Sequence, residues 1–163
     1  MNGPSTISLP LNGGLFNFRV AGVAVCNDRV LLHKTPSDNF WSLPGGRVDM
    51  FELTMETLLR EMAEETGITA EVEDLMWVVE NFFSYDGNKY HEVGFYYRMV
   101  VPVLENQHDF QTIEEGGELL FHWHEIDKLH EIRIYPDFIS ADLIRNTKFT
   151  KHITSAFKDL NAG

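Results

Sequence analysis

Three glutamates, Glu61, Glu64 and Glu65, have a spacing that places their side chains on one face of a helix. At 100° per residue they fall within an arc of roughly 100°. Like charges at this spacing destabilise a helix by a few tenths of a kcal/mol per pair, so the cluster needs a compensating partner. Mg²⁺ is a suitable one, because it binds carboxylate oxygens, keeps several waters and bridges to phosphates. The alternative is a solvated acidic face, in which Arg60 simply pairs with Glu64 four residues later.

A helix is predicted to position these glutamates from about Thr54 to Thr66, where apolar residues recur at helical spacing. We expect its apolar face to be buried; that face consists of Met55, Leu58, Leu59 and Met62. The centre of the acidic arc lies about 120° away from this stripe. Gly67 is well placed to end the helix as a left-handed C-cap.

The glutamates belong to a longer frame of spaced residues. Gly46 is followed by five residues and Glu52, and then by seven residues and the run Arg60-Glu61-Met62-Ala63-Glu64-Glu65-Thr66-Gly67-Ile68. This frame resembles the signature of the Nudix hydrolases. Seven identities and two apolar positions match, a coincidence expected by chance on the order of 10⁻⁸ per start position. The resemblance implies cleavage of a diphosphate that links a nucleoside to another group, with Mg²⁺ or Mn²⁺ as the cofactor.

The same resemblance implies roles for individual residues. The implied metal ligands are Glu61, Glu64, Glu65 and the carbonyl oxygen of Gly45. Either Glu61 or Glu64 is also the candidate catalytic base for the attacking water, and Arg60 is the residue that orients the glutamates. Glu52 would secure the loop to the helix, close to the metal.

One position departs from the family pattern. The residue before Glu52 is commonly glycine in the family and is Phe51 here. Phenylalanine lacks the freedom of glycine at positive φ. If the loop needs that freedom, it must curve differently in this chain, which affects the loop geometry and not the metal site.

Further candidates lie outside the signature. Some Nudix enzymes take an additional glutamate, as base or ligand, from a later polar loop, where the candidates here are Glu114, Glu115 and Glu118. The candidates for substrate binding are Arg19, Trp41, Phe83 and Tyr85. Contacts with phosphates and stacking on a base are the functional interpretation, whereas a surface arginine and ordinary aromatic packing are the alternatives. Tyr85 lies 18 residues beyond Gly67, an offset that the family associates with dinucleoside polyphosphates.

Composition limits the class of protein. With 163 residues, the chain predicts a single domain over residues 1–163. A formal charge of −12 argues against long nucleic acid or an anionic membrane as the partner. Small phosphorylated ligands remain compatible, because a bound metal and a few arginines supply local positive charge. The single Cys26 excludes an internal disulfide, and without a leader pattern we expect a cytoplasmic protein; a homodimer remains open.

Turn signals and alternation predict the other elements. We expect strands over residues 15–26, 29–34, 40–46, 69–83, 90–103 and 119–124, and a second helix over residues 136–146. Residues 1–14 are predicted to be an irregular arm or an edge strand, and residues 104–117 a polar loop. The seven histidines are scattered and predict no zinc site.

Together these elements predict an α/β fold, a Nudix-type α/β/α sandwich with a mixed central sheet. The expected function is hydrolysis of a nucleoside diphosphate linked to another moiety, since every acidic position of the signature is present. One alternative is a nucleotide-sensing domain that binds without cleaving, which a damaged glutamate or a fused DNA-binding segment would favour. Another is isoprenoid diphosphate isomerisation, which needs a cysteine in the site, and Cys26 in its hydrophobic strand is a poor candidate.

Overall fold

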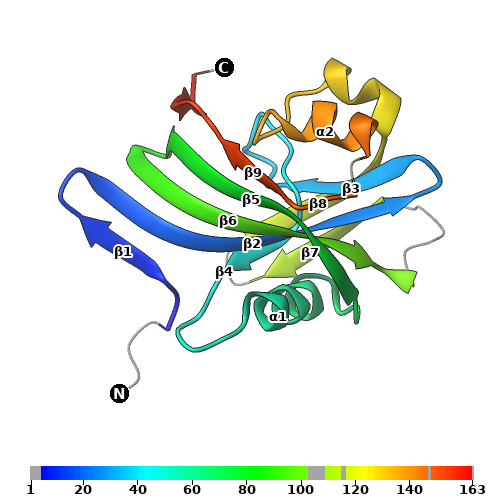
Figure 1. Cartoon of the computed structure of the whole chain (residues 1–163), viewed down its shortest axis with the longest axis horizontal. Helices are drawn as coiled ribbons and strands as arrows, with labels where there is room; N and C mark the ends of the chain where they lie inside the picture. Colours follow the sequence, from blue (N-terminus) through cyan, green and yellow to red (C-terminus); the bar gives the residue numbers. More distant parts are fainter. Residues whose placement is uncertain (1–4, 103–108, 115–116, 147, 163) are drawn as a thin grey trace.

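Helices cover both faces of a mixed β-sheet (Figure 1). The computed structural model describes residues 5–102, 109–114, 117–146 and 148–162. Its helices are α1 (Thr54–Thr66), the 3₁₀ helix η2 (Ile126–Glu131) and α2 (Ile139–Arg145). Its strands are β1 (Ser8–Leu11), β2 (Gly14–Cys26), β3 (Arg29–Lys34), β4 (Gly45–Arg47), β5 (Glu71–Tyr85), β6 (Asn88–Val100), β7 (Phe110–Glu114), β8 (Gly117–Glu125), β9 (Lys151–Thr154) and β10 (Lys158–Asp159). No described helix is long and apolar enough to cross a membrane.

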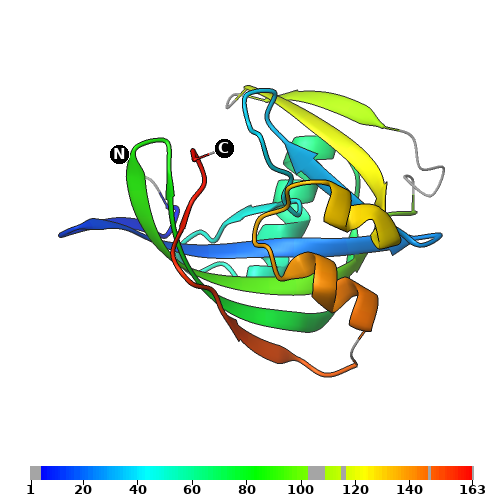
Figure 2. The same cartoon turned by 90° about the horizontal axis from the view of Figure 1, so that it is seen from above.

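Strand β2 is the centre of the sheet. It pairs in parallel with β6 and antiparallel with β1, β3 and β4. The order across the sheet is β10-β5-β6-β2-β3-β8-β7, and β9 and β10 both pair in parallel with β5. Figures 1 and 2 show β1 at one end of β2 and the β2–β3 hairpin at the other. Because parallel partners need a long crossover, the chain between β2 and β6 has room for β4 and α1.

Each face of the sheet has its own core. On the α1 side, Leu58 and Met62 are fully buried and pack with Val20 of β2. On the opposite side, Ile139 of α2 packs in a second core with Ala21. Successive residues of β2 therefore serve opposite faces, as the pleat of a strand requires. The predicted α/β/α sandwich with a mixed sheet is confirmed, with α1 below and α2 above the sheet in Figure 1.

Helix α1 has the predicted bounds but only part of the predicted buried face. Leu58 and Met62 are buried, whereas Met55 and Leu59 are 41% and 38% exposed, so their predicted burial is wrong. The buried strip runs instead through Leu58, Met62 and Glu65. These residues are spaced i, i+4 and i+7, which is a narrower stripe on one side of the helix. A glutamate of the signature is therefore carried into the interior.

The strand predictions agree with the structure in most places. Strands β2, β3 and β8 match their predicted ranges within two residues, and β5 and β6 are joined at Asp86 and Gly87, both at positive φ, as a two-residue hairpin requires. Residues 8–11 form the edge strand that was the alternative to an irregular arm. In the predicted loop over residues 104–117, residues 110–114 instead form β7, because they pair with β8.

Two segments differ from their predicted extents. The second helix begins at Ile139 and not at residue 136, and it ends at Arg145. The strand predicted over residues 40–46 is reduced to isolated bridges at Trp41 and Ser42 followed by β4. Residues of both segments, Ser42 and Pro136 among them, line the pocket described below, and a local pattern does not encode that contact.

Candidate functional site

Two glycines let the signature loop lie against its neighbours. A Cβ on Gly46 would lie 2.2 Å from Cδ of Glu61, so any side chain at this position would displace that carboxylate. A Cβ on Gly45 would lie 2.1 Å from the carbonyl oxygen of Val20. Strand β4 can therefore pair closely with β2 only with glycine here. The Gly-Gly pair places the Glu61 carboxylate directly over the backbone of β4.

Arg60 holds three carboxylates together. Its Nε and Nη2 donate to the two oxygens of Glu52, both at 2.9 Å. Its Nη1 donates to Oε1 of Glu61 at 2.8 Å and to Oε2 of Glu64 at 3.2 Å. The pair with Glu64 is thus present, but it is the longest of four hydrogen bonds. A planar guanidinium can form this set, whereas an ammonium group lacks the fork.

The electrostatics of this cluster follow from Arg60. Its hydrogen bonds lower the pKa of Glu52 to about 2, and Thr57 adds a hydrogen bond from Oγ1 at 2.7 Å. Burial raises the pKa of Glu61, and Arg60 opposes that shift. The ionised Glu52 in turn raises the pKa of Arg60. Loop and helix are therefore joined by a charge-assisted pair that persists across the neutral range.

Glu65 is buried more deeply than the other two signature glutamates. It is 7% exposed, and its Oε2 lies 3.8 Å from Nδ1 of His33. Burial lowers the pKa of His33 to about 3, so this imidazole is neutral at neutral pH. The side chains of Glu61 and Glu64 are 19% and 58% exposed. The acidic face expected from the helix geometry therefore spans surface and interior.

The donor set at this face suits a divalent cation. Carboxylate oxygens and a backbone carbonyl are the ligands that Mg²⁺ and Mn²⁺ prefer. Glu61 and Glu64 each use one oxygen for Arg60 and have a second, and the missing side chain at Gly46 provides space beside Glu61. Over the described ranges, no three or more His, Cys, Asp or Glu side chains gather in a metal-binding arrangement. The ligand set of Glu61, Glu64, Glu65 and Gly45 stays a prediction.

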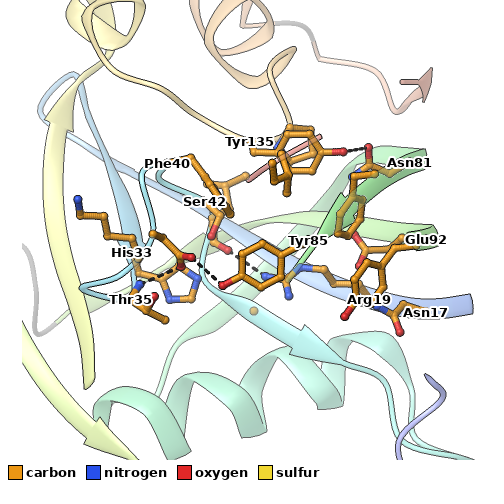
Figure 3. Close-up of a pocket in the computed structure, with 18 of the residues that line it drawn as sticks. Asn17, Arg19, His33, Thr35, Phe40, Ser42, Asn81, Tyr85, Glu92 and Tyr135 are labelled. Carbon is orange, nitrogen blue, oxygen red and sulfur yellow. Dashed lines mark hydrogen bonds between the residues drawn. The ribbon is translucent and has the colours of Figure 1, made fainter. Parts of the chain in front are cut away.

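A pocket of about 330 Å³ adjoins the signature (Figure 3). Gly45 and Glu65 line it, as do three of the residues predicted to bind substrate, Arg19, Phe83 and Tyr85. Arg19 donates from Nη2 to the carbonyl oxygen of Leu43 at 3.3 Å. The structure therefore brings two predicted metal ligands and three predicted substrate contacts around one cavity.

Aromatic side chains form a wall of this pocket. Phe83 stacks on Tyr90, with ring centroids 4.8 Å apart and an interplanar angle of 16°. The Tyr85 hydroxyl donates to Oδ1 of Asp38 at 2.7 Å, which ties the β5–β6 hairpin to the loop after β3. Desolvation and Asp38 raise the pKa of Tyr85 to about 12, so it remains a neutral donor. An apolar wall with few polar groups is typical of small-ligand sites.

Among the described residues, several predicted site residues do not line this pocket: Trp41, Glu118, Glu52, Arg60, Glu61 and Glu64. Trp41 packs edge-on against His124, with centroids 4.6 Å apart, which matches the packing alternative. Glu115 lies outside the described residues. Glu114 ends β7, and the exposed Glu118 follows at the start of β8. The role of an additional base stays a prediction.

Sequence analysis missed three polar residues at the inner end of the pocket. Glu92 of β6 lies in register with Asn17 of β2 on one side and Asn81 of β5 on the other. All three are buried and line the pocket. Burial raises the pKa of Glu92, opposed by Arg19 and by a hydrogen bond from Asn17. The available signal was a polar residue inside each otherwise apolar strand, but cross-strand register is not visible in the sequence.

Comparisons with known proteins identify the family of this chain. The family model of the NUDIX domain matches residues 17–143. An uncharacterized Nudix hydrolase, YvcI of Bacillus subtilis, is 28% identical over 110 residues, which cover 68% of this chain and 66% of the relative. A MutT-like protein of Streptomyces ambofaciens is 43% identical over 68 residues, which cover 41% of this chain and 44% of the relative. The matched region thus spans under two thirds of the length of either relative.

Solved structures share the fold at low sequence identity. An ADP-ribose pyrophosphatase from Streptococcus suis superposes with a TM-score of 0.58 at 13% identity, covering 85% of this chain and 98% of that one. A MutT protein from Bacillus halodurans also gives 0.58, at 24% identity, covering 85% of this chain and 90% of that one. The family model covers most of the chain and includes the whole signature. The chain belongs to the Nudix (MutT-like) family of hydrolases.

Proposed function

We propose that this protein is a divalent-metal-dependent pyrophosphohydrolase that cleaves the diphosphate of a nucleoside diphosphate linked to another moiety. One observation carries the proposal: Gly45 and Glu65, from the predicted metal site, line the same pocket as Arg19 and the aromatic pair Phe83 and Tyr90. A diphosphate near the signature can therefore belong to a molecule whose ring lies among the aromatic side chains. A cytoplasmic location and a homodimer stay predictions from the sequence.

The chain's residues divide the work of hydrolysis. Mg²⁺ or Mn²⁺ held by Glu61, Glu64, Glu65 and the Gly45 carbonyl would offset the charge on the diphosphate and favour ionisation of a water. Arg60 fixes the orientation of Glu61 and Glu64 through the hydrogen bonds already described. Glu61 or Glu64 accepts the proton of the attacking water. The guanidinium of Arg19 supplies positive charge inside the pocket for the substrate phosphates.

The test is a product-release assay with four substrate groups: nucleoside triphosphates with ordinary or oxidised bases, ADP-ribose, dinucleoside polyphosphates and nucleotide sugars. We expect turnover of at least one group with Mg²⁺ or Mn²⁺, and none in excess EDTA. Glu64→Gln should lower turnover by a factor on the order of 10² or more, because it removes a charged oxygen ligand.

The matched control is Glu56→Gln on the same helix. Glu56 accepts a hydrogen bond from the Leu53 N–H at 3.0 Å, and the glutamine oxygen can accept it too, so activity should be unchanged. Equal loss in both variants would assign the effect to the helix and not to the metal site. Nucleotide binding without any turnover would identify a sensing domain and contradict the proposal.

A further inference from the structure

The segment after α2 returns to the pocket described above. It forms β9 and β10, which both pair in parallel with β5, on the side of that strand away from β6. Figures 1 and 2 show this segment running along β5 toward the β5–β6 hairpin. The family model ends at residue 143, so β9, β10 and the residues after them lie outside the matched region. The family comparison therefore assigns no role to this segment.

Leu160 brings this segment into the wall of the pocket. It directly follows β10, lines the pocket and is only 4% exposed. Its side chain packs in a cluster with Phe83 and Tyr135, which also line the pocket. Its backbone N–H donates to the carbonyl oxygen of Ser84 on β5 at 2.9 Å. Because the backbone is bonded and the side chain is buried, Leu160 is held in one place against the aromatic wall.

The residues on either side of Leu160 are attached to two structures that border the pocket. Oδ1 of Asn161 accepts a hydrogen bond at 2.7 Å from the backbone N–H of Asp86, in the turn of the β5–β6 hairpin. Nζ of Lys158 lies 3.0 Å from Oδ2 of Asp137, which precedes α2. Exposed ion pairs contribute little to stability, so the packing of Leu160 and the hydrogen bonds to β5 and its hairpin fix the segment.

Leu160 lies at the end of the pocket that is remote from the signature. It packs on Phe83, which is in register across β6 with Leu15 of β2. Gly45 of the signature pairs with Ala21 of the same strand. Leu15 and Ala21 are six residues apart, which corresponds to roughly 20 Å along a strand. If the diphosphate lies near Gly45, the group that reaches Leu160 is the end of the substrate opposite to the phosphates.

The pocket is small enough for one side chain to limit what enters it. Its volume of about 330 Å³ is near the lower limit for ligand pockets, which span about 300–1,000 Å³. One extra or missing methylene in an apolar pocket changes the discrimination between ligands by roughly tenfold or more. A shorter or longer side chain at position 160 should therefore change which ligands fit.

We propose that Leu160 is a specificity-determining residue, which closes the end of the pocket opposite to the signature and limits the length of the group that can lie there. The inference rests on the proposed function, in which that group is the nucleobase. The limit is steric, because a leucine side chain has no hydrogen-bond donor or acceptor and therefore sorts ligands by size. The residue that sets this limit comes from the part of the chain outside the matched family domain.

Binding of nucleoside diphosphates in EDTA tests this inference separately from hydrolysis. The probes are ADP and GDP, which carry the longer purine bases, and CDP and UDP, which carry the shorter pyrimidines. Isothermal titration calorimetry gives the purine-to-pyrimidine ratio of affinities. Leu160→Ala should raise this ratio by about tenfold, because the longer base gains room. Leu160→Phe should lower the ratio, because the end wall moves inward.

Asn161→Ala tests the same wall without a change in the core. Asn161 is exposed, so we expect this variant to fold like the wild type. Loss of the bond to Asp86 should speed amide hydrogen exchange in the turn of the β5–β6 hairpin. The purine-to-pyrimidine ratio should rise, but by less than in Leu160→Ala, because Leu160 keeps its side chain and is held less firmly.

Leu143→Ala serves as the matched control. Leu143 is buried in the core between α2 and the sheet and lies outside the lining of this pocket. The variant should lower Tm as Leu160→Ala does and leave the ratio unchanged. Equal ratios in the wild type, Leu160→Ala and Leu160→Phe would overturn the inference, as would a lack of binding of all four diphosphates. The expected shifts in binding without hydrolysis of any nucleotide in Mg²⁺ or Mn²⁺ would remove the proposed function and leave this inference standing.

Discussion

Glu52 and Glu92 are two carboxyl groups whose surroundings shift their pKa values in opposite directions. Glu52 accepts two hydrogen bonds from Arg60 and one from Thr57, which lower its pKa to about 2. The ionised form of Glu52 is therefore stabilised by partners within the protein. Burial raises the pKa of Glu92, opposed by the charge of Arg19 and by hydrogen bonds from Asn17 and Asn81. At Glu92 the cost of burial exceeds the effect of these partners, because the net shift of its pKa is upward.

The difference shows how the surroundings of a carboxyl group set the charge state that is favoured: an ion pair favours the ionised form, whereas burial favours the neutral form. Arg60 joins α1 to Glu52, a loop residue eight positions earlier in the sequence, and also holds Glu61 and Glu64. Glu92 instead lies in register with the buried Asn17 and Asn81 on the neighbouring strands. A carboxylate held by a guanidinium keeps a fixed position and charge, which favours catalysis at the neighbouring glutamates. The predictions below test this contrast.

The largest effect should follow from Arg60→Lys, which keeps the charge and removes the guanidinium fork. Glu61 and Glu64 lose the bonds that orient them, so we expect kcat to fall by about 10² with a smaller change in KM. Steady-state kinetics on the substrate identified in the release assay would measure this. A kcat equal to that of the wild type would mean that Arg60 forms only a surface ion pair and would remove it from the site.

Stability should respond in opposite directions to the same change at the two glutamates. Glu52→Gln should lower the free energy of unfolding at pH 7 by about 2 kcal/mol, because it removes a charge-assisted pair. Glu92→Gln should raise it by about 1 kcal/mol in the absence of ligand, because a buried charge is removed. For a chain of this size, 1 kcal/mol corresponds to a shift of roughly 2–4 °C in Tm. Shifts of the same sign would contradict the comparison.

The two effects also depend on pH in opposite ways. The pKa of Glu52 is lowered on folding from 4.5 to about 2, so its stabilisation is present above pH 4.5 and is lost as the pH falls toward 2. The pKa of Glu92 is raised on folding, so the wild type loses stability as the pH rises above 4.5. The Tm advantage of Glu92→Gln should therefore disappear below about pH 4.5. Thermal scans from pH 3 to pH 8, an assay range of about five units, would show both trends.

The smallest effect concerns Phe51, beside Glu52. Phe51 adopts a φ of 68° and is fully exposed, so the expectation of a differently curved loop is wrong: the loop keeps the left-handed conformation despite the side chain. Such a conformation costs a residue with a Cβ about 1 kcal/mol or more. Phe51→Gly should raise Tm slightly. The free energy of unfolding should rise by less than about 1 kcal/mol, because glycine also gains conformational entropy in the unfolded state. Phe51→Ala keeps the left-handed strain and should leave Tm unchanged. Equal Tm values for Phe51→Gly and Phe51→Ala would show that the loop is unstrained.

Local spacing was enough to predict the helix, its C-cap at Gly67 and the closeness of Arg60 to Glu64, because helix geometry relates residues three and four apart. It also predicted the β2–β3 and β5–β6 hairpins from their turn residues. It did not predict that Met55 would be exposed and Glu65 buried, since the side of α1 that contacts the sheet depends on how the helix packs.

The sequence by itself determined the family signature and most of the elements of this protein. Only the tertiary structure decided the inner end of the pocket, where Asn17, Asn81 and Glu92 meet. The parallel pairing of β2 with β6 sets this row, and its residues are separated by up to 75 positions in the chain. Because a shift of one residue in that register would turn every side chain to the opposite face, contacts between distant strands, and not local pattern, determine which polar groups line the pocket.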